Sequence, residues 1–116
     1  DVYKRQLLLL LSLRWPIQGP VIQKPSMRHP AVDIACIPGT EVVAVHGGRM
    51  HVRHEYDMGN TIVINGVGLQ SYYAHLQTVT EPRDVVAGEV IGTCGSTGTY
   101  SNGPHLHFAV ESLPNL

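Results

Sequence analysis

Short apolar stretches, interrupted by glycine, proline and polar turns, run along most of the chain and predict β-strands. No apolar pattern with the helical period of about 3.6 residues persists for three turns anywhere in the sequence. The runs expected to form strands are 41–45, 49–53, 61–65, 69–75, around 85–91, and 105–110. This pattern predicts a single antiparallel all-β domain.

The first residues differ in character from the rest, and we expect the domain itself to cover 15–116. Residues 1–6 resemble the translated end of a transposon adapter used in sequencing libraries, so we interpret them as an adapter scar. The leucine-rich run that follows is read either as a remnant of a leader, anchor or linker, or as an apolar element capping the domain. It is far shorter than the ~18 residues that a membrane-spanning helix needs.

Length and composition fit one small domain rich in turns. The chain has 116 residues, of which 43% are hydrophobic, enough for a real core. Charged residues make up only 15%, and the chain has 12 glycines and 8 prolines, which favours short strands joined by tight turns. A net charge of -1 leaves no basic surface for phosphate backbones or anionic lipid, so nucleic acid is not an expected partner.

Seven histidines nearly equal the eight lysines and arginines in number, and the first of three histidine-bearing segments has the spacing of a metal site. In this segment His29 precedes Asp33 by four residues. Pro30 keeps His29 out of the helical region, and side chains four residues apart share one face of a strand. The imidazole and the carboxylate are therefore expected to converge.

Two further segments add histidines with strand spacing. His105 and His107 should share one face of a strand, while the apolar residues at 106 and 108 occupy the other. Between these segments in the sequence, strict alternation places His75 on the same face as Tyr73. Two or three such strands side by side would gather four imidazoles and a carboxylate in one groove.

This combination resembles the lysostaphin-like zinc metallopeptidases, also called LytM-type cell-wall hydrolases. The marks of that family are His-x-x-x-Asp, a Tyr-Ala-His-Leu-like segment and a Gly-Pro-His-Leu-His end, which are residues 29–33, 73–76 and 103–107 here. Further matching stretches are 15–19, 38–40, 59–60, 87–92 and 95–98. The resemblance spans about residues 15–111, nearly the whole chain.

The resemblance implies an all-β domain of the LytM type, a duplicated hybrid barrel or sandwich with its active site in a groove. It implies one zinc ion per chain, bound by His29, Asp33 and His107, with His75 and His105 left to act on the substrate. Three protein ligands leave a fourth position open for water, as in catalytic zinc sites. One free histidine would take a proton from water and the other would stabilise the oxyanion or protonate the leaving amine; the sequence does not assign these tasks.

On the same basis we expect a zinc endopeptidase that hydrolyses peptide bonds in the stem peptides or cross-bridges of bacterial peptidoglycan. Tyr73 is the expected substrate contact. This substrate requires an extracytoplasmic location, whether periplasmic, secreted or membrane-anchored, with any anchor upstream of the visible chain, and we expect a monomer. Two departures from the family pattern, Pro82-Arg83 and Ala109, affect neither a ligand nor a catalytic group.

Two other functions are open to such a sequence. A non-catalytic LytM-like module that binds the cell wall or activates an amidase is the main alternative, although the presence of all five key positions favours an enzyme. A cysteine hydrolase using Cys36 or Cys94 with His75 would leave the other histidines unexplained. The two cysteines lie far apart with no Cys-x-x-Cys pair, so their pairing is left open.

The remaining histidines and the glycine-rich stretch near the C-terminus are expected to lie in loops. His46, His51 and His54 have no carboxylate at ligand spacing apart from neighbours in a loop, so we interpret them as solvated loop residues. Residues 92–103 lack the Gly-Lys-Ser/Thr ending of a phosphate-binding loop. They predict a turn-rich rim beside the strand that carries His105.

Overall fold

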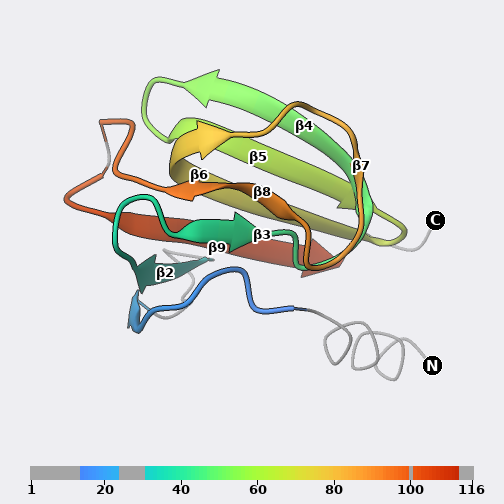
Figure 1. Cartoon of the computed structure of the whole chain (residues 1–116), viewed down its shortest axis with the longest axis horizontal. Helices are drawn as coiled ribbons and strands as arrows, with labels where there is room; N and C mark the ends of the chain where they lie inside the picture. Colours follow the sequence, from blue (N-terminus) through green and yellow to red (C-terminus); the bar gives the residue numbers. More distant parts are fainter. Residues whose placement is uncertain (1–13, 24–30, 100, 113–116) are drawn as a thin grey trace.

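The computed structural model describes residues 14–23, 31–99 and 101–112, which form strands and no helix (Figure 1). The strands in this part are β1 (Val21–Gln23), β2 (Val32–Ala35), β3 (Glu41–Val43), β4 (Gly48–Glu55), β5 (Gly59–Gly66), β6 (Leu69–Val79), β7 (Asp84–Val85), β8 (Val90–Cys94) and β9 (His105–Ser112). All of their pairings are antiparallel, which confirms the predicted fold class. Within the described ranges, no helix is long and apolar enough to span a bilayer.

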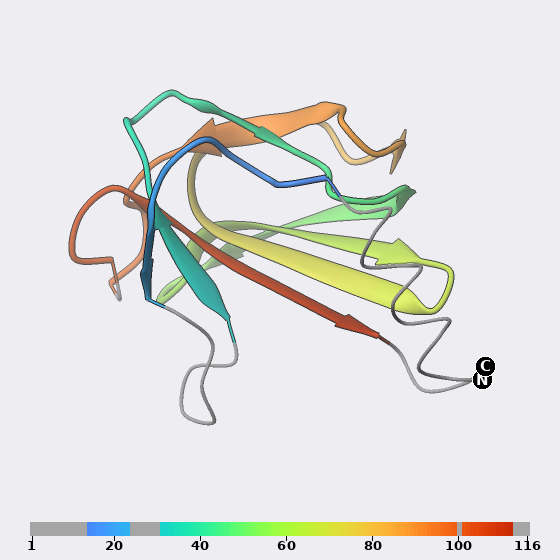
Figure 2. The same ribbon diagram turned by 90° about the horizontal axis from the view of Figure 1, so that it is seen from below.

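The strands form two layers joined through β6. One path runs β1-β2-β9-β6-β5-β4-β7, and β8 pairs with both β6 and β3. The first part of β6 lies between β5 and β9, whereas its last residues pair with β8. Seen from below, β3 and β8 form one layer, and β4, β5 and β6 of the larger sheet lie opposite them (Figure 2). The change of partner along β6 is the corner between the two layers.

The core fills the space between these layers because each strand alternates apolar and polar side chains. On β9, Leu106 and Phe108 are buried, whereas His105 and His107 lie on the opposite face and stay partly exposed. The largest completely buried apolar side chains are Tyr73, Ile34, Met50, Ile62, Ile64, Leu76, Ile91 and Leu106. Each Leu-sized side chain buried this way contributes about 1.5–3 kcal/mol to folding. The opposite face of the larger sheet is thereby left to polar residues.

Most of the predicted strands are present, with two differences. The run around 85–91 is divided into β7 and β8 by a turn in which the Glu89 amide donates to the Val86 carbonyl and Gly88 has a φ of 92°. The short strand β1 was not predicted, because its three residues are all exposed and show no apolar alternation. The interpretation of residues 1–13 concerns a part of the chain outside the described residues.

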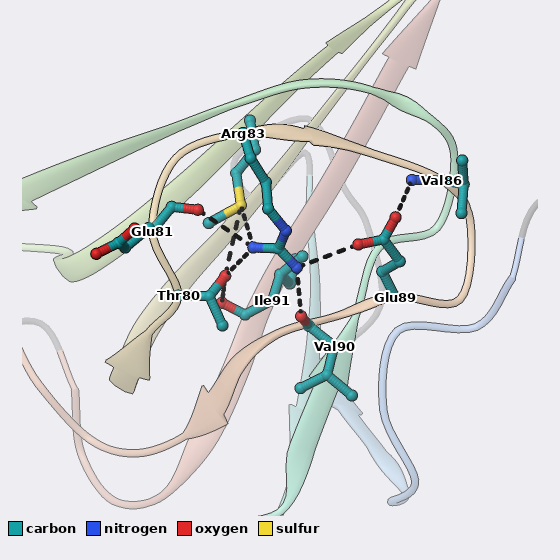
Figure 3. Close-up of polar contacts among 8 residues, drawn as sticks. Thr80, Glu81, Arg83, Val86, Glu89, Val90 and Ile91 are labelled. Carbon is teal, nitrogen blue, oxygen red and sulfur yellow. Dashed lines mark hydrogen bonds and ion pairs between the residues drawn. The ribbon is translucent and has the colours of Figure 1, made fainter.

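The turn between β6 and β7 is held by Arg83 (Figure 3). Its guanidinium donates to the Thr80 hydroxyl at 2.5 Å and to the carbonyls of Glu81 and Val90 at 3.2 and 3.0 Å. It also lies 3.2 Å from the Glu89 carboxylate, which in turn accepts the backbone N–H of residue 86. The arginine that departs from the family pattern therefore has a structural function remote from the histidines.

A disulfide between Cys36 and Cys94 ties the end of β2 to the end of β8. It joins residues 58 positions apart, and closing a loop of this length removes unfolded-state entropy worth about 4 kcal/mol in the chain-entropy account. Cys94 is fully buried in the core. The bond therefore fixes β2, which carries Asp33, against the second layer.

Candidate functional site

The site is built on neighbouring strands whose register brings Asp33 and the C-terminal histidines together. On β2 and β9, Asp33 lies opposite His107 and Ala35 lies opposite His105, so all four side chains point to the same face. Asp33 Oδ1 lies 3.0 Å from His107 Nδ1 and 3.8 Å from His105 Nε2. Asp33 is only 8% exposed. The prediction that His105 and His107 share one face of a strand is confirmed.

His75 reaches this face through a β-bulge that the sequence did not indicate. Asn60 pairs with Leu76 and Ile62 with Tyr73, so two residues of β6, Ala74 and His75, lie opposite one residue of β5. His75 has a φ of 62°, and the extra residue turns its side chain toward the His105 and His107 rings. The prediction that His75 shares a face with Tyr73 is therefore wrong, because it assumed unbroken alternation.

Two hydrogen bonds offset the strain of this conformation. A non-glycine residue at positive φ costs of order 1–3 kcal/mol. The His75 amide donates to the Met58 carbonyl at 2.9 Å, and its Nδ1 donates to the Thr97 carbonyl at 2.7 Å. His75 is 2% exposed. The Met58 carbonyl therefore fixes its backbone, and the Thr97 carbonyl holds its buried ring in one orientation.

Tyr73 belongs to the core and not to the groove. It has no exposed surface, its hydroxyl accepts the Val45 amide at 3.0 Å and lies 2.8 Å from the Ser71 hydroxyl, and its ring packs on Phe108. Burial raises the pKa of Tyr73 to about 12. The expected substrate contact at Tyr73 is therefore wrong. The neighbouring Tyr72 faces the groove, with its ring centroid 6.4 Å from that of His107.

The protons on His75 and His105 are placed by backbone carbonyls. A carbonyl only accepts, so Nδ1 of His75 carries the proton bonded to Thr97, and Nδ1 of His105 carries the proton bonded to Gly103 at 2.9 Å. Each Nε2 is then the basic nitrogen. Burial lowers the pKa of His75 below 6.5, although the Thr97 carbonyl opposes this. His75 is therefore neutral near pH 7 and able to accept a proton.

The chemistry of Asp33 and His107 fits zinc. Nitrogen and carboxylate oxygen are both common zinc ligands, and two ligand atoms about 2.0–2.1 Å from a tetrahedral ion lie about 3.3 Å apart. The 3.0 Å between Asp33 Oδ1 and His107 Nδ1 is close to this spacing. His29, the third expected ligand, lies outside the described residues. Among the residues that are described, no group of three or more His, Cys, Asp or Glu side chains is placed to hold a metal ion.

The walls of the site come from β1, from the loop before β5 and from the predicted rim before β9. A cavity of about 480 Å³ lies over the histidines, lined also by residues 22 and 23 of β1, by Met58 and by residues 102–104. Thr99 joins two rim loops, because its amide donates to the Tyr56 carbonyl and its hydroxyl to the Asp57 carboxylate. Gly98, with a φ of 90°, allows the backbones to approach, since a Cβ there would overlap Asp57. The predicted turn-rich rim is present.

The other three histidines do not all lie in solvated loops, as had been expected. His51 and His54 are exposed residues of β4, and His54 Nδ1 donates to the Asn60 side chain at 2.8 Å. His46 is only 8% exposed, and its Nδ1 donates to the Gly47 carbonyl at 2.7 Å. Strand β4 extends two residues beyond the predicted 49–53, which places His54 in a strand, and His51 lies within the predicted range itself.

The disulfide bears on the cysteine-hydrolase alternative. Both cysteines of the chain are paired with each other, so neither offers a thiolate to His75. Cys94 is also fully buried. In this structure no cysteine can act as the nucleophile.

Comparisons with known proteins agree with the geometry. Residues 27–114 match Peptidase family M23. The chain is 39% identical over 83 residues to the DD-carboxypeptidase/endopeptidase Mpg of Neisseria meningitidis, covering 69% of this chain and 19% of Mpg. It is 37% identical over 108 residues to the murein hydrolase activator NlpD of Salmonella dublin, covering 84% of this chain and 28% of NlpD. The chain thus spans less than a third of either relative.

Solved structures share the fold. Lysostaphin from Staphylococcus simulans superposes with a TM-score of 0.71 at 30% identity, covering 87% of this chain and 44% of that one. A zinc-containing peptidase from Vibrio cholerae gives a TM-score of 0.76 at 25% identity, covering 86% of this chain and 36% of that one. Because the family match covers most of the chain and the neighbours in sequence and structure agree with it, the protein belongs to Peptidase family M23, the family of the LytM-type motifs.

Proposed function

We propose that this domain is a zinc-dependent endopeptidase that hydrolyses peptide bonds in bacterial peptidoglycan. The observation that carries the proposal is the convergence of Asp33 and His107 with two histidines, His75 and His105, whose Nδ1 atoms are held by carbonyls. A domain that only binds its partner has no need of a histidine kept neutral by burial in a strained conformation. Membership of a peptidase family supports the same reaction class.

The residues divide into a metal-binding set and a proton-transfer set. Zinc would be held by His29, Asp33 and His107, and when bound it supplies polarisation of the scissile carbonyl and a more acidic water molecule. His75 accepts the proton of the attacking water at Nε2, since its lowered pKa keeps that nitrogen unprotonated. His105, whose ring centroid is 4.8 Å from that of His75, donates from Nε2 to the oxyanion or the leaving amine when its ring is doubly protonated, while Nδ1–H stays bonded to the Gly103 carbonyl.

The substrate and the location rest on the relatives. Mpg is named an endopeptidase and NlpD a murein hydrolase activator, so both names support a peptidoglycan substrate for this chain. A cell-wall substrate places the domain outside the cytoplasm. The Cys36–Cys94 disulfide supports this location, because such bonds persist in oxidising compartments.

A second function is supported by the likeness to NlpD, which covers 84% of this chain. In that case the groove would bind the cell wall or a partner amidase without hydrolysis. The two functions differ in whether new amino groups appear when the domain acts on its substrate.

Digestion of purified sacculi separates the two functions. The wild-type domain should release new amino groups, lose this activity with a chelator and regain it with added zinc. His75→Ala should keep bound zinc and release almost none. A zinc-loaded domain that binds sacculi and releases no amino groups would instead support the activator function.

A further inference from the structure

The face of the sheet that carries His107 continues across β6 and β5 onto β4. Tyr72 lies opposite Ala109 and Val63, and Arg53 lies opposite Thr61, two residues from Val63 on β5. Side chains two residues apart on a strand share a face. The groove face therefore runs from His107 over Tyr72 to Arg53 and then to Glu55.

Tyr72 connects the histidine site to these two charges. Its ring meets His107 edge-on, and its hydroxyl donates to Glu55 Oε1 at 2.9 Å. Burial and this hydrogen bond to Glu55 raise the pKa of Tyr72 to about 12, and the nearby Arg53 charge acts in the opposite direction. The carboxylate and the guanidinium thus both lie near the Tyr72 hydroxyl.

The side chains of Arg53 and Glu55 have hydrogen-bonding and ion-pairing capacity left, unlike two other arginines of this protein, which are paired with carboxylates. Arg49 pairs with Asp84 at 3.5 Å, and Arg83 pairs with Glu89 at 3.2 Å. Within the described ranges, the side chain of Arg53 makes no hydrogen bond or ion pair, and the side chain of Glu55 makes only the bond to Tyr72, through one oxygen. Arg53 is exposed and Glu55 is half-buried. The second carboxylate oxygen of Glu55 and the guanidinium of Arg53 are therefore available for binding on the face of the sheet that carries His107.

We propose that Glu55 and Arg53 form a subsite for a free α-amino-acid end of the peptide substrate, with the ammonium bound by Glu55 and the carboxylate by Arg53. Residues two apart on a strand are about 6.6–6.8 Å apart along its axis. The side chains of Arg53 and Glu55 leave the backbone at this spacing, so an ammonium and a carboxylate on one carbon can each meet one of them through a charge-assisted hydrogen bond of about 2.8 Å. A lone amine would use only half of this subsite. Tyr72 is a positioning residue that orients Glu55.

This inference rests on the proposed function, because it assigns the specificity of the same groove. It predicts that the enzyme distinguishes peptides by a group several ångströms from the cleaved bond. Three matched peptides test it: one ends in a diamino acid with free distal amino and carboxyl groups, one has that amine acetylated, and one has that carboxyl amidated.

With the wild-type chain, acetylation or amidation should each lower kcat/KM by about tenfold, mostly through KM, because each removes one charge-assisted hydrogen bond. Glu55→Gln should lower kcat/KM for the free-amine peptides and leave the acetylated peptide unchanged. Arg53→Gln should lower kcat/KM for the peptides with a free distal carboxylate and leave the amidated peptide unchanged. Tyr72→Phe should reduce discrimination at the amine with little change in kcat. Arg49→Gln, on the same strand, is the matched control and should change none of these ratios.

The two-charge subsite would be overturned if acetylation lowered kcat/KM and amidation did not. It would also be overturned if Glu55→Gln lowered kcat/KM equally for all three peptides. Calorimetric binding of the same peptides to the His75→Ala chain keeps the inference separate from catalysis. If no peptide is hydrolysed, the proposed function fails, whereas a tenfold weaker binding of the acetylated and amidated peptides would still support the subsite. Equal binding of all three peptides would overturn it.

Discussion

The cluster around Arg83 and the histidine groove use polar side chains in opposite ways. At Arg83 the donors and acceptors face one another, so the guanidinium, the Glu89 carboxylate and two carbonyls stabilise a turn. In the groove, the carbonyls hold one nitrogen of His75 and of His105 and direct the other toward a cavity. Changes in the first region should therefore alter folding stability, and changes in the second should alter turnover.

Removal of a metal ligand should produce the largest effect on the groove. In Asp33→Ala the carboxylate that lies 3.0 Å from His107 is lost, and two remaining ligands rarely hold zinc. We expect loss of most bound zinc by metal analysis and a fall in kcat of at least about 10³-fold. His29→Ala should behave in the same way. Full zinc occupancy in both variants would contradict the ligand assignment.

Loss of a proton-transfer histidine should lower turnover and leave zinc in place. His75→Ala and His105→Ala should each reduce kcat by about 10²–10⁴-fold, the usual worth of a positioned acid, base or oxyanion donor. Zinc content and the thermal midpoint should stay close to those of the wild type. A variant that loses its zinc would show that the residue is a ligand.

Removal of the disulfide should lower stability and leave turnover unchanged. The double variant Cys36→Ser with Cys94→Ser should lose about 4 kcal/mol of unfolding free energy, because the crosslink spans 58 residues. Denaturant titration measures this loss. The folded fraction should keep its kcat, since neither sulfur faces the groove. Inactivation of the intact, zinc-loaded protein by a thiol reagent would contradict this account.

Replacement of Arg83 should cause a smaller loss of stability. Arg83→Met removes donors to two carbonyls and a pair with Glu89 whose side chains are each 36% exposed, so solvent weakens the ionic part. We expect a loss of about 1–2 kcal/mol with kcat unchanged. Arg49→Met is the matched control, because its pair with Asp84 is 54% and 86% exposed and should contribute under about 0.5 kcal/mol.

The pH profile should show the smallest effect. His75 acts as a base only when neutral, and burial lowers its pKa below 6.5. Activity should therefore persist below pH 6.5 and fall as the pH drops through the folded-state pKa. The free energy of unfolding should also fall as the pH drops, since the unfolded chain binds the proton more readily. The acid limb of kcat/KM measures this, and residual activity of His75→Ala should lack that limb.

The sequence was informative wherever simple alternation holds. His105 and His107 share a face with Asp33 because β2 and β9 pair without interruption. The strands were predicted for the same reason, as apolar residues at every second position build one buried face. Motif spacing therefore located most of the site before any geometry was known.

The errors arise where the chain departs from alternation or where contacts are distant in sequence. The bulge at His75 depends on the Met58 and Thr97 carbonyls, which no local pattern connects to it. It also explains why Tyr73 was assigned to the groove in place of Tyr72. The pairing of Cys36 with Cys94 follows from the path of the loop after β2, where the Gly39 amide donates to the Cys94 carbonyl, and spacing alone could not show this.

The positive φ of His75 has a consequence for how such domains change over evolutionary time. The backbone at this position suits glycine better than histidine, so the proposed proton transfer favours histidine there more than the fold does. In a lineage where hydrolysis is no longer selected, this codon should drift before those of the buried strands around it. Under the proposed function, the residue found at this bulge records whether a given copy is still selected for hydrolysis.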